Sequence, residues 1–281
     1  GRTMMKRMVA MLAALACTAA FTSVVAPASA ENVSPNRGRF AALGDSYAAG
    51  VGNPMIPRTD CGQSVDAYPV RLAGAANKVT FLACSGATTA QALAQVARVP
   101  VTAREVTVTI GGNDVDFVGT LTECAKGEPY CTEALQDAYM TLAELPSSLG
   151  QLVGAIHAQA PSAQITVTGY PILFQATDAC AVYLSTTRAS LNAVDTANAA
   201  LNQAIGGTVA SLALNPLNRL PVRFVSVEAA FEDHGICSGP ASWIFPVTFA
   251  APGVPNVSSL HPTAAGQSAY ASAIKAAGFP S

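Results

Sequence analysis

Short runs of β-branched and apolar residues alternate with longer alanine-rich stretches along most of this chain, and this alternation constrains the fold more than any other feature. Strands are expected at 39–43, 78–83, 105–110, 164–169 and 222–227. Helices are expected at 68–76, 88–96, 132–159 (broken or kinked near Pro146), 187–213 and 263–277. Such alternation predicts an α/β fold with a parallel sheet covered by helices on both faces. In these sheets ligands bind beyond the carboxyl ends of the strands.

The first thirty residues differ in composition from the rest. Basic residues precede an almost wholly apolar run, 8–26, and Ala28-Ser29-Ala30 has the small-x-small form of a cleavage site. This pattern predicts a secretory signal peptide over 1–30, removed before Glu31, and hence a secreted protein. A membrane anchor is the alternative, and the absence of stop-transfer charges after the run argues against it. A lipid-attachment site at Cys17 fits less well still.

The remaining segment, 31–281, is long enough for one good-sized core, so we expect a single domain there. The whole chain has a formal charge of −2, and loss of the basic leader makes it more acidic. A mildly acidic chain without a basic cluster argues against nucleic acid as a partner. No repeat or coiled-coil pattern is present, and a monomer that takes a small-molecule substrate is the expectation.

Six cysteines follow the leader, at positions 61, 84, 124, 131, 180 and 237. An even number in an exported chain suggests disulfides, although the sequence does not choose among the possible pairings. Pairing of neighbours along the chain is the simplest arrangement. Metal binding is the rival interpretation. It is disfavoured because no Cys-x-x-Cys occurs and no histidine stands at ligand spacing, so neither a metal nor another cofactor is expected.

Small and polar motifs follow the first three expected strands, and another precedes the last helix. They are Gly44-Asp45-Ser46, Cys84-Ser85-Gly86-Ala87, Gly111-Gly112-Asn113-Asp114 and Leu260-His261-Pro262. Each motif alone is weak evidence. Together they supply a hydroxyl nucleophile, a backbone N–H at a glycine, a side-chain amide and a base, which are the parts that serine catalysis needs. Their positions at strand ends and at a helix start allow them to converge on one cleft.

This set of motifs resembles the SGNH-hydrolase family, also called GDSL esterases and lipases. The four letters are matched by Ser46, Gly86, Asn113 and His261, in the family's order and over essentially all of 31–281. The resemblance implies a flavodoxin-like three-layer α/β/α sandwich around a five-stranded parallel sheet. The cysteines and the region of Trp243 are most similar to the secreted actinobacterial lipases and phospholipases. Three sequential disulfides are usual in that branch, which implies the pairs Cys61–Cys84, Cys124–Cys131 and Cys180–Cys237.

The resemblance also implies a role for each matched residue. Ser46 would attack an ester carbonyl, and His261 would act as general base and then as general acid. The backbone N–H groups of Ser46 and Gly86 and the amide of Asn113 would form the oxyanion hole. The implied activity is that of a secreted serine esterase or lipase acting on carboxylic esters, lipids and phospholipids included. A carbohydrate acetylesterase of the same fold and a non-catalytic secreted binding protein are the alternatives.

One position departs from the family pattern. The family usually has an aspartate three residues before the histidine, and Ser258 stands there. Some actinobacterial relatives use a dyad in which a backbone carbonyl holds the histidine Nδ1–H, and by that analogy the carbonyl of Ser259 would do so. His234 is the less favoured alternative as base. For five residues the sequence does not distinguish between lining an acyl pocket and packing in the core. They are Tyr47, Trp243, Ile244, Phe245 and Phe249.

Overall fold

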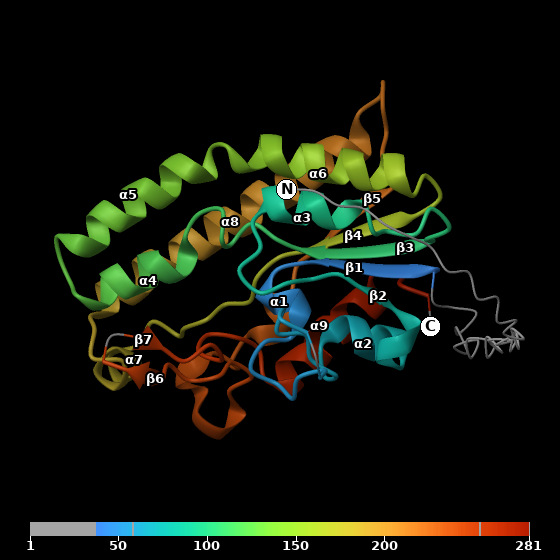
Figure 1. Cartoon of the computed structure of the whole chain (residues 1–281). Helices are drawn as coiled ribbons and strands as arrows, with labels where there is room; N and C mark the ends of the chain where they lie inside the picture. Colours follow the sequence, from blue (N-terminus) through green and yellow to red (C-terminus); the bar gives the residue numbers. More distant parts are fainter. Residues whose placement is uncertain (1–37, 58, 253, 281) are drawn as a thin grey trace, which may run out of the picture. The chain divides into compact units, whose positions relative to one another are not determined.

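The computed structural model describes residues 38–57, 59–252 and 254–280. Its centre is a five-stranded sheet in the order β2-β1-β3-β4-β5, in which every pairing is parallel. The strands are β1 (Phe40–Gly44), β2 (Thr80–Phe81), β3 (Glu105–Thr109), β4 (Gln164–Thr168) and β5 (Val222–Val225). The predicted α/β fold with a five-stranded parallel sheet is confirmed (Figure 1).

Helices cover both faces of this sheet (Figure 1). One layer holds α3 (Thr89–Val96), α6 (Leu145–Gln159) and α8 (Arg188–Leu214), and the other holds α2 (Tyr68–Ala73) and α9 (Ala264–Ala276). Every residue of β1 is buried. Its alternate side chains pack into two different apolar clusters. Phe40 and Ala42 belong to the cluster on one face, and Ala41 and Leu43 belong to the cluster on the other. A strand buried on both faces explains why β1 is continuously apolar.

Side-chain caps fix the starts of several helices. Thr88 and Gln91 form a capping box at α3, and Thr187 and Thr263 accept backbone N–H groups at the starts of α8 and α9. The long helix expected at 132–159 is two helices, α5 (Tyr130–Leu142) and α6. Pro146 lies in the first turn of α6, where its missing N–H has no cost.

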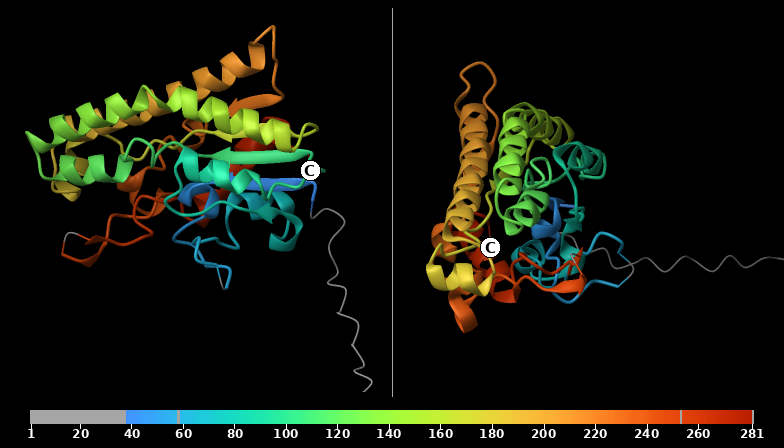
Figure 2. Two further views of the ribbon diagram at one scale, coloured as in Figure 1. Left: turned by 45° about the horizontal axis from the view of Figure 1, so that its top comes forward. Right: turned by 90° about the vertical axis from the view of Figure 1, so that its left-hand side faces the viewer.

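The structure contains elements that the sequence pattern did not predict. These are α1 (Ser46–Ala49), α4 (Phe117–Ala125), α7 (Asp178–Tyr183), β6 (Phe249–Ala251), β7 (Val254–Pro255) and the short 3-10 helices η1 (Ala76–Lys78), η2 (Ala229–Phe231) and η3 (Ile236–Ala241). The strand expected at 78–83 is shorter because η1 occupies its start. The antiparallel pair α4 and α5 projects beyond the end of the sheet at which α1 lies (Figures 1 and 2).

Three disulfides join neighbouring cysteines along the chain. Cys61–Cys84 ties the loop after α1 to the loop after β2, Cys124–Cys131 closes the turn between α4 and α5, and Cys180–Cys237 joins α7 to η3. All three therefore constrain segments outside the sheet. Among the described residues, no helix has the length and apolar character that a membrane span needs.

Candidate active site

Ser46 lies at the sharp turn where β1 passes into α1. Asp45 caps α1 by accepting the Tyr47 N–H at 2.9 Å, and its own N–H donates to the Thr109 carbonyl of β3 at 3.0 Å. Gly44 has a φ of +128°, and a Cβ there would lie 2.2 Å from the same carbonyl oxygen. Only glycine fits this close approach. The turn therefore places Ser46 at the carboxyl end of β1, a strand inside the sheet.

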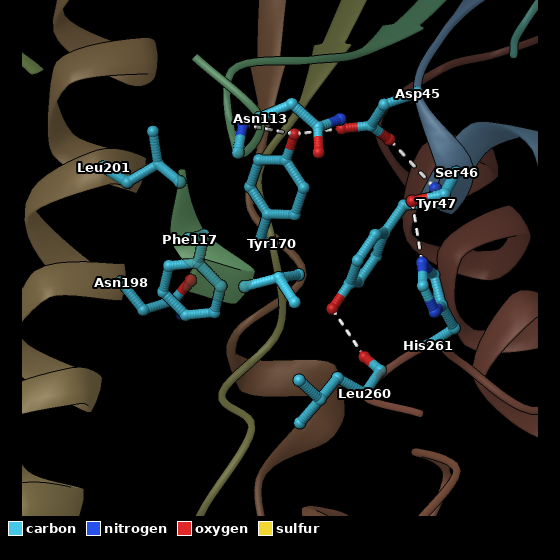
Figure 3. Close-up of a pocket in the computed structure, with 12 residues that line it drawn as sticks. Asp45, Ser46, Tyr47, Asn113, Phe117, Tyr170, Asn198, Leu201, Leu260 and His261 are labelled. Atoms are coloured by element: carbon cyan, nitrogen blue, oxygen red, sulfur yellow. Dashed lines mark hydrogen bonds between the residues drawn. The ribbon is translucent and has the colours of Figure 1, made fainter. Parts of the chain in front are cut away.

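His261 comes from the opposite end of the sequence and points its ring at Ser46 (Figure 3). Its Nε2 lies 2.7 Å from the Ser46 Oγ, and its Nδ1 lies 3.0 Å from the carbonyl oxygen of Ser259. A carbonyl oxygen can only accept a hydrogen bond, so Nδ1 carries the proton and Nε2 is the free acceptor in the neutral ring. This tautomer allows Nε2 to take the hydroxyl proton of Ser46.

The segment before His261 holds the Ser259 carbonyl in place. The Ser259 hydroxyl donates to the Thr248 carbonyl and accepts the Thr248 N–H, each at 3.0 Å. The N–H of Ser259 donates to the Asn256 carbonyl at 3.0 Å. Phe245 holds the next two residues through its backbone. Its carbonyl accepts the Leu260 N–H, and its N–H donates to the His261 carbonyl. These contacts hold the Ser259 carbonyl beside the Nδ1 of His261.

Loss of water around the His261 ring lowers its pKa to about 4. Its hydrogen bond to the Ser259 carbonyl opposes this shift but is the weaker effect. The imidazole is consequently neutral at neutral pH. A neutral imidazole is the form that a general base needs before reaction begins.

Two of the three expected oxyanion donors, Ser46 and Asn113, line the same pocket. The Asn113 amide nitrogen donates to the Ala87 carbonyl at 2.9 Å, which leaves its second hydrogen for another acceptor. Gly86 precedes that carbonyl, is exposed, and has a φ of +78°. The N–H groups of Ser46 and Gly86 donate to no other group among the residues described. A Cβ at Gly86 would meet nothing within 4 Å, so the glycine is explained by its φ and not by crowding.

The Asp45 carboxyl faces away from His261 and joins two loops of the site. It accepts hydrogen bonds from the Tyr47 N–H and from the Tyr170 hydroxyl. The Tyr170 hydroxyl in turn accepts the Gly112 N–H at 2.9 Å. Burial raises the pKa of Asp45 to about 7, against the effect of the Tyr170 hydrogen bond. Asp45 thus connects the loop that carries the nucleophile to the loop that carries Asn113.

The other nearby aspartates have structural partners. Asp114 accepts the N–H and hydroxyl of Thr89, Asp116 accepts the Gly119 N–H at the start of α4, and Asp233 accepts the Gln175 amide. None of them forms a hydrogen bond to His261 in the described part of the chain. In those same residues, no group of three His, Cys, Asp or Glu side chains is placed to hold a metal ion.

His234 takes no part in this arrangement. Its ring stacks on Trp243, with centroids 3.5 Å apart and planes 3° apart, and its Nδ1 contacts the Ala241 carbonyl. Ile244 is buried in the core, whereas Phe249 is 60% exposed. Of the five residues left open between pocket and core, Tyr47 is the one that lines the active-site pocket.

A largely apolar pocket opens at Ser46 and His261 and encloses about 470 Å³, part of it continuous with solvent. Phe117 and Val118 of α4 form one wall, and Asn198 and Leu201 of α8 form another, as Figure 3 shows for three of them. Sequence reasoning missed these four residues. Asn198 and Leu201 lie on a helix far from the motifs in the chain. Phe117 and Val118 closely follow the motif at 111–114, but the helix that carries them, α4, was not predicted.

A family comparison agrees with this geometry. The sequence model of the GDSL-like Lipase/Acylhydrolase family matches residues 42–269, a range that includes Ser46, Gly86, Asn113 and His261. The chain belongs to this family. The chain is an ester hydrolase of the GDSL/SGNH type.

Individual relatives cover most of the chain. A lipase from Streptomyces rimosus is 36% identical over 236 residues, which is 82% of each sequence. The crystal structure of an extracellular lipase from S. rimosus has a TM-score of 0.75 at 34% identity and covers 85% of this chain and 99% of that one. Phospholipase A1 from Streptomyces albidoflavus NA297 has a TM-score of 0.75 at 32% identity, with the same coverage.

Proposed function

We propose that Ser46 is the nucleophile and His261 the general base in the hydrolysis of carboxylic esters. The observation that carries this proposal is the 2.7 Å contact between the Ser46 Oγ and the His261 Nε2. The distance is within the range that proton transfer requires, and the Nδ1 contact to Ser259 leaves Nε2 free to accept.

The reaction proceeds in two halves. His261 Nε2 takes the proton as the Ser46 Oγ attacks the ester carbonyl, and the resulting oxyanion accepts hydrogen bonds from the N–H groups of Ser46 and Gly86 and from the Asn113 amide. The imidazolium then protonates the leaving alkoxide, and the acyl group stays on Ser46. Water attacks this acyl-enzyme with His261 again as base. The bond to the Ser46 Oγ then breaks, the imidazolium returns its proton to that oxygen, and the carboxylic acid leaves.

The Ser259 carbonyl takes the place of a triad acid in this proposal. It fixes the tautomer and the direction of the His261 ring. A neutral carbonyl stabilises the imidazolium less than a carboxylate does. Burial is the main cause of the low pKa of His261, and no carboxylate charge among the described residues offsets it.

The substrates that we propose are esters with an apolar acyl chain, including lipids and phospholipids. The apolar walls beside Ser46 support this class, as do the lipase and phospholipase A1 among the relatives. We further propose that residues 1–30 are a signal peptide, outside the described residues, and that 31–281 is exported as a single-domain monomer. The three disulfides and the extracellular relative support export.

An ester panel tests the function. Nitrophenyl esters, a phospholipid and an acetylated sugar are assayed with the natural chain and with Ser46→Ala, whose folding is checked by melting temperature. Hydrolysis of acyl esters that Ser46→Ala abolishes supports the proposal. Turnover confined to the acetylated sugar would assign the enzyme to carbohydrate acetylesterases, and unchanged turnover in Ser46→Ala would remove Ser46 as nucleophile.

A further inference from the structure

A second hollow lies beside the active-site pocket, between α4, α5 and α8. The unfilled space there amounts to about 280 Å³, part of it open to solvent. Its lining includes Val115, Ala138 and Leu142, which are absent from the first pocket. Phe117 and Leu201 line both spaces. The two hollows are therefore neighbours that share a wall.

Phe117 is the less buried part of that wall. Leu201 is held in the core at 2% exposure, whereas Phe117 is half-buried and is the first residue of α4. The residue before it, Asp116, has a φ of +46°, which turns the chain sharply into the helix. In Figure 3 the Phe117 ring lies beside Asn198 and Leu201, across the pocket from the Ser46 and His261 side chains.

We propose that the Phe117 ring ends the acyl-binding slot and so sets the longest acyl chain that this enzyme binds in full. This inference rests on the proposed ester hydrolysis at Ser46. The occupant is the unbranched hydrocarbon chain of the substrate acid, because most of the exposed surface of the pocket is apolar and Phe117, Val118 and Leu201 supply much of it. The hollow behind Phe117 has apolar walls too, and it receives the distal methylenes once the ring is removed.

The size of the expected effect follows from hydrocarbon transfer. Each methylene moved from water into an apolar site favours binding by about fourfold. Two or three additional buried methylenes therefore change the preference for a long chain over a short one by roughly 15-fold to 60-fold. A short acyl chain does not reach the second hollow, so its kcat/KM gains nothing from the removal of the ring.

The test compares Phe117→Ala with the natural chain on soluble nitrophenyl esters from acetate to laurate, below their aggregation limits. The ratio of kcat/KM for long to short esters is expected to rise at least 10-fold. Phe249→Ala is the matched control, because Phe249 is 60% exposed and lines neither hollow, and its ratio is expected to stay unchanged. Phe117→Leu is expected to raise the same kcat/KM ratio by a smaller factor. It replaces Phe117→Ala in the test if that variant folds poorly.

A double variant fills the second hollow again. Ala138 lines the second hollow alone, so Ala138→Phe in the Phe117→Ala background should return the ratio toward its natural value. Ala138→Phe alone should leave the chain-length profile unchanged. The inference would be overturned if Phe117→Ala folds and hydrolyses short esters but its long-to-short ratio of kcat/KM is the same as that of the natural chain. If the natural chain hydrolyses no ester and a fluorophosphonate does not label its Ser46, the proposed function itself would be overturned.

Discussion

The Tyr47 hydroxyl donates a 2.6 Å hydrogen bond to the Leu260 carbonyl, and so links the residue after Ser46 to the residue before His261. Leu260 has a φ of +70°, a conformation that costs a non-glycine residue on the order of 1 kcal/mol. The Tyr47 ring also lies 5.2 Å from the His261 ring. One side chain thus holds both halves of the site in register.

Replacement of Tyr47 by phenylalanine removes this link and keeps the ring. The loss of one hydrogen bond of about 1 kcal/mol predicts a fall in kcat of roughly fivefold to tenfold, with little change in KM. Tyr270→Phe is the control, since it removes a buried hydroxyl that donates to the Gly169 carbonyl at 3.0 Å, away from the pocket. Equal losses of kcat in both variants would mean that Tyr47 contributes only to stability.

The low pKa of His261 predicts an unusual pH profile. The active form has neutral His261, so protonation abolishes activity as the pH falls through about 4, and kcat/KM is expected to be flat from about pH 5.5 upward. An unperturbed histidine, with a pKa of about 6.5, would lose most activity by pH 5.5. The measurement is kcat/KM against pH with an uncharged ester, together with a folding control at each pH. An acid limb near pH 6.5 would contradict the desolvated environment of the ring.

Ser258→Asp restores a carboxylate at the position where the family usually has one. A negative charge near the ring favours the imidazolium, so the pKa of His261 rises and the acid limb moves upward from about 4. Ser258→Asn supplies similar volume without charge and should leave the acid limb where it is. Identical pH profiles for the two variants would show that this position does not reach the Nδ1 side of His261.

In the proposed mechanism, Asn113 supplies an uncharged donor to the oxyanion. Asn113→Ala is expected to lower kcat about 100-fold to 1000-fold with a small change in KM, because the donor acts mainly in the transition state. Asn215→Ala changes an exposed asparagine at the end of α8 and serves as the control. A loss below about threefold would place the oxyanion elsewhere.

The fold and the motif residues were predictable because they depend on local patterns. The apolar run 40–43 is buried in β1, and the motifs after β1, β2 and β3 meet because parallel strands end at one edge of a sheet. The α4 wall was not predictable in this way. Its start depends on Asp116 in a left-handed conformation, and Phe117 meets Leu201 only through packing of α4 and α5 against α8.

The contacts of Tyr47 were likewise outside the reach of sequence patterns. Its place beside Ser46 made Tyr47 a candidate for either the pocket or the core, and its side chain has two roles. Its ring lines the pocket, and its hydroxyl reaches Leu260 across 213 positions of sequence. Such a contact exists only once the last loop folds back over the first strand.

The central claim is that Ser46, activated by His261, becomes covalently acylated. Its most direct test is mass spectrometry of the folded protein after treatment with a fluorophosphonate, with His261→Ala treated alongside. We predict one adduct, on the peptide that contains Ser46, and a strongly slowed reaction in His261→Ala. An adduct on another residue, or none in a preparation that hydrolyses esters, would contradict the account.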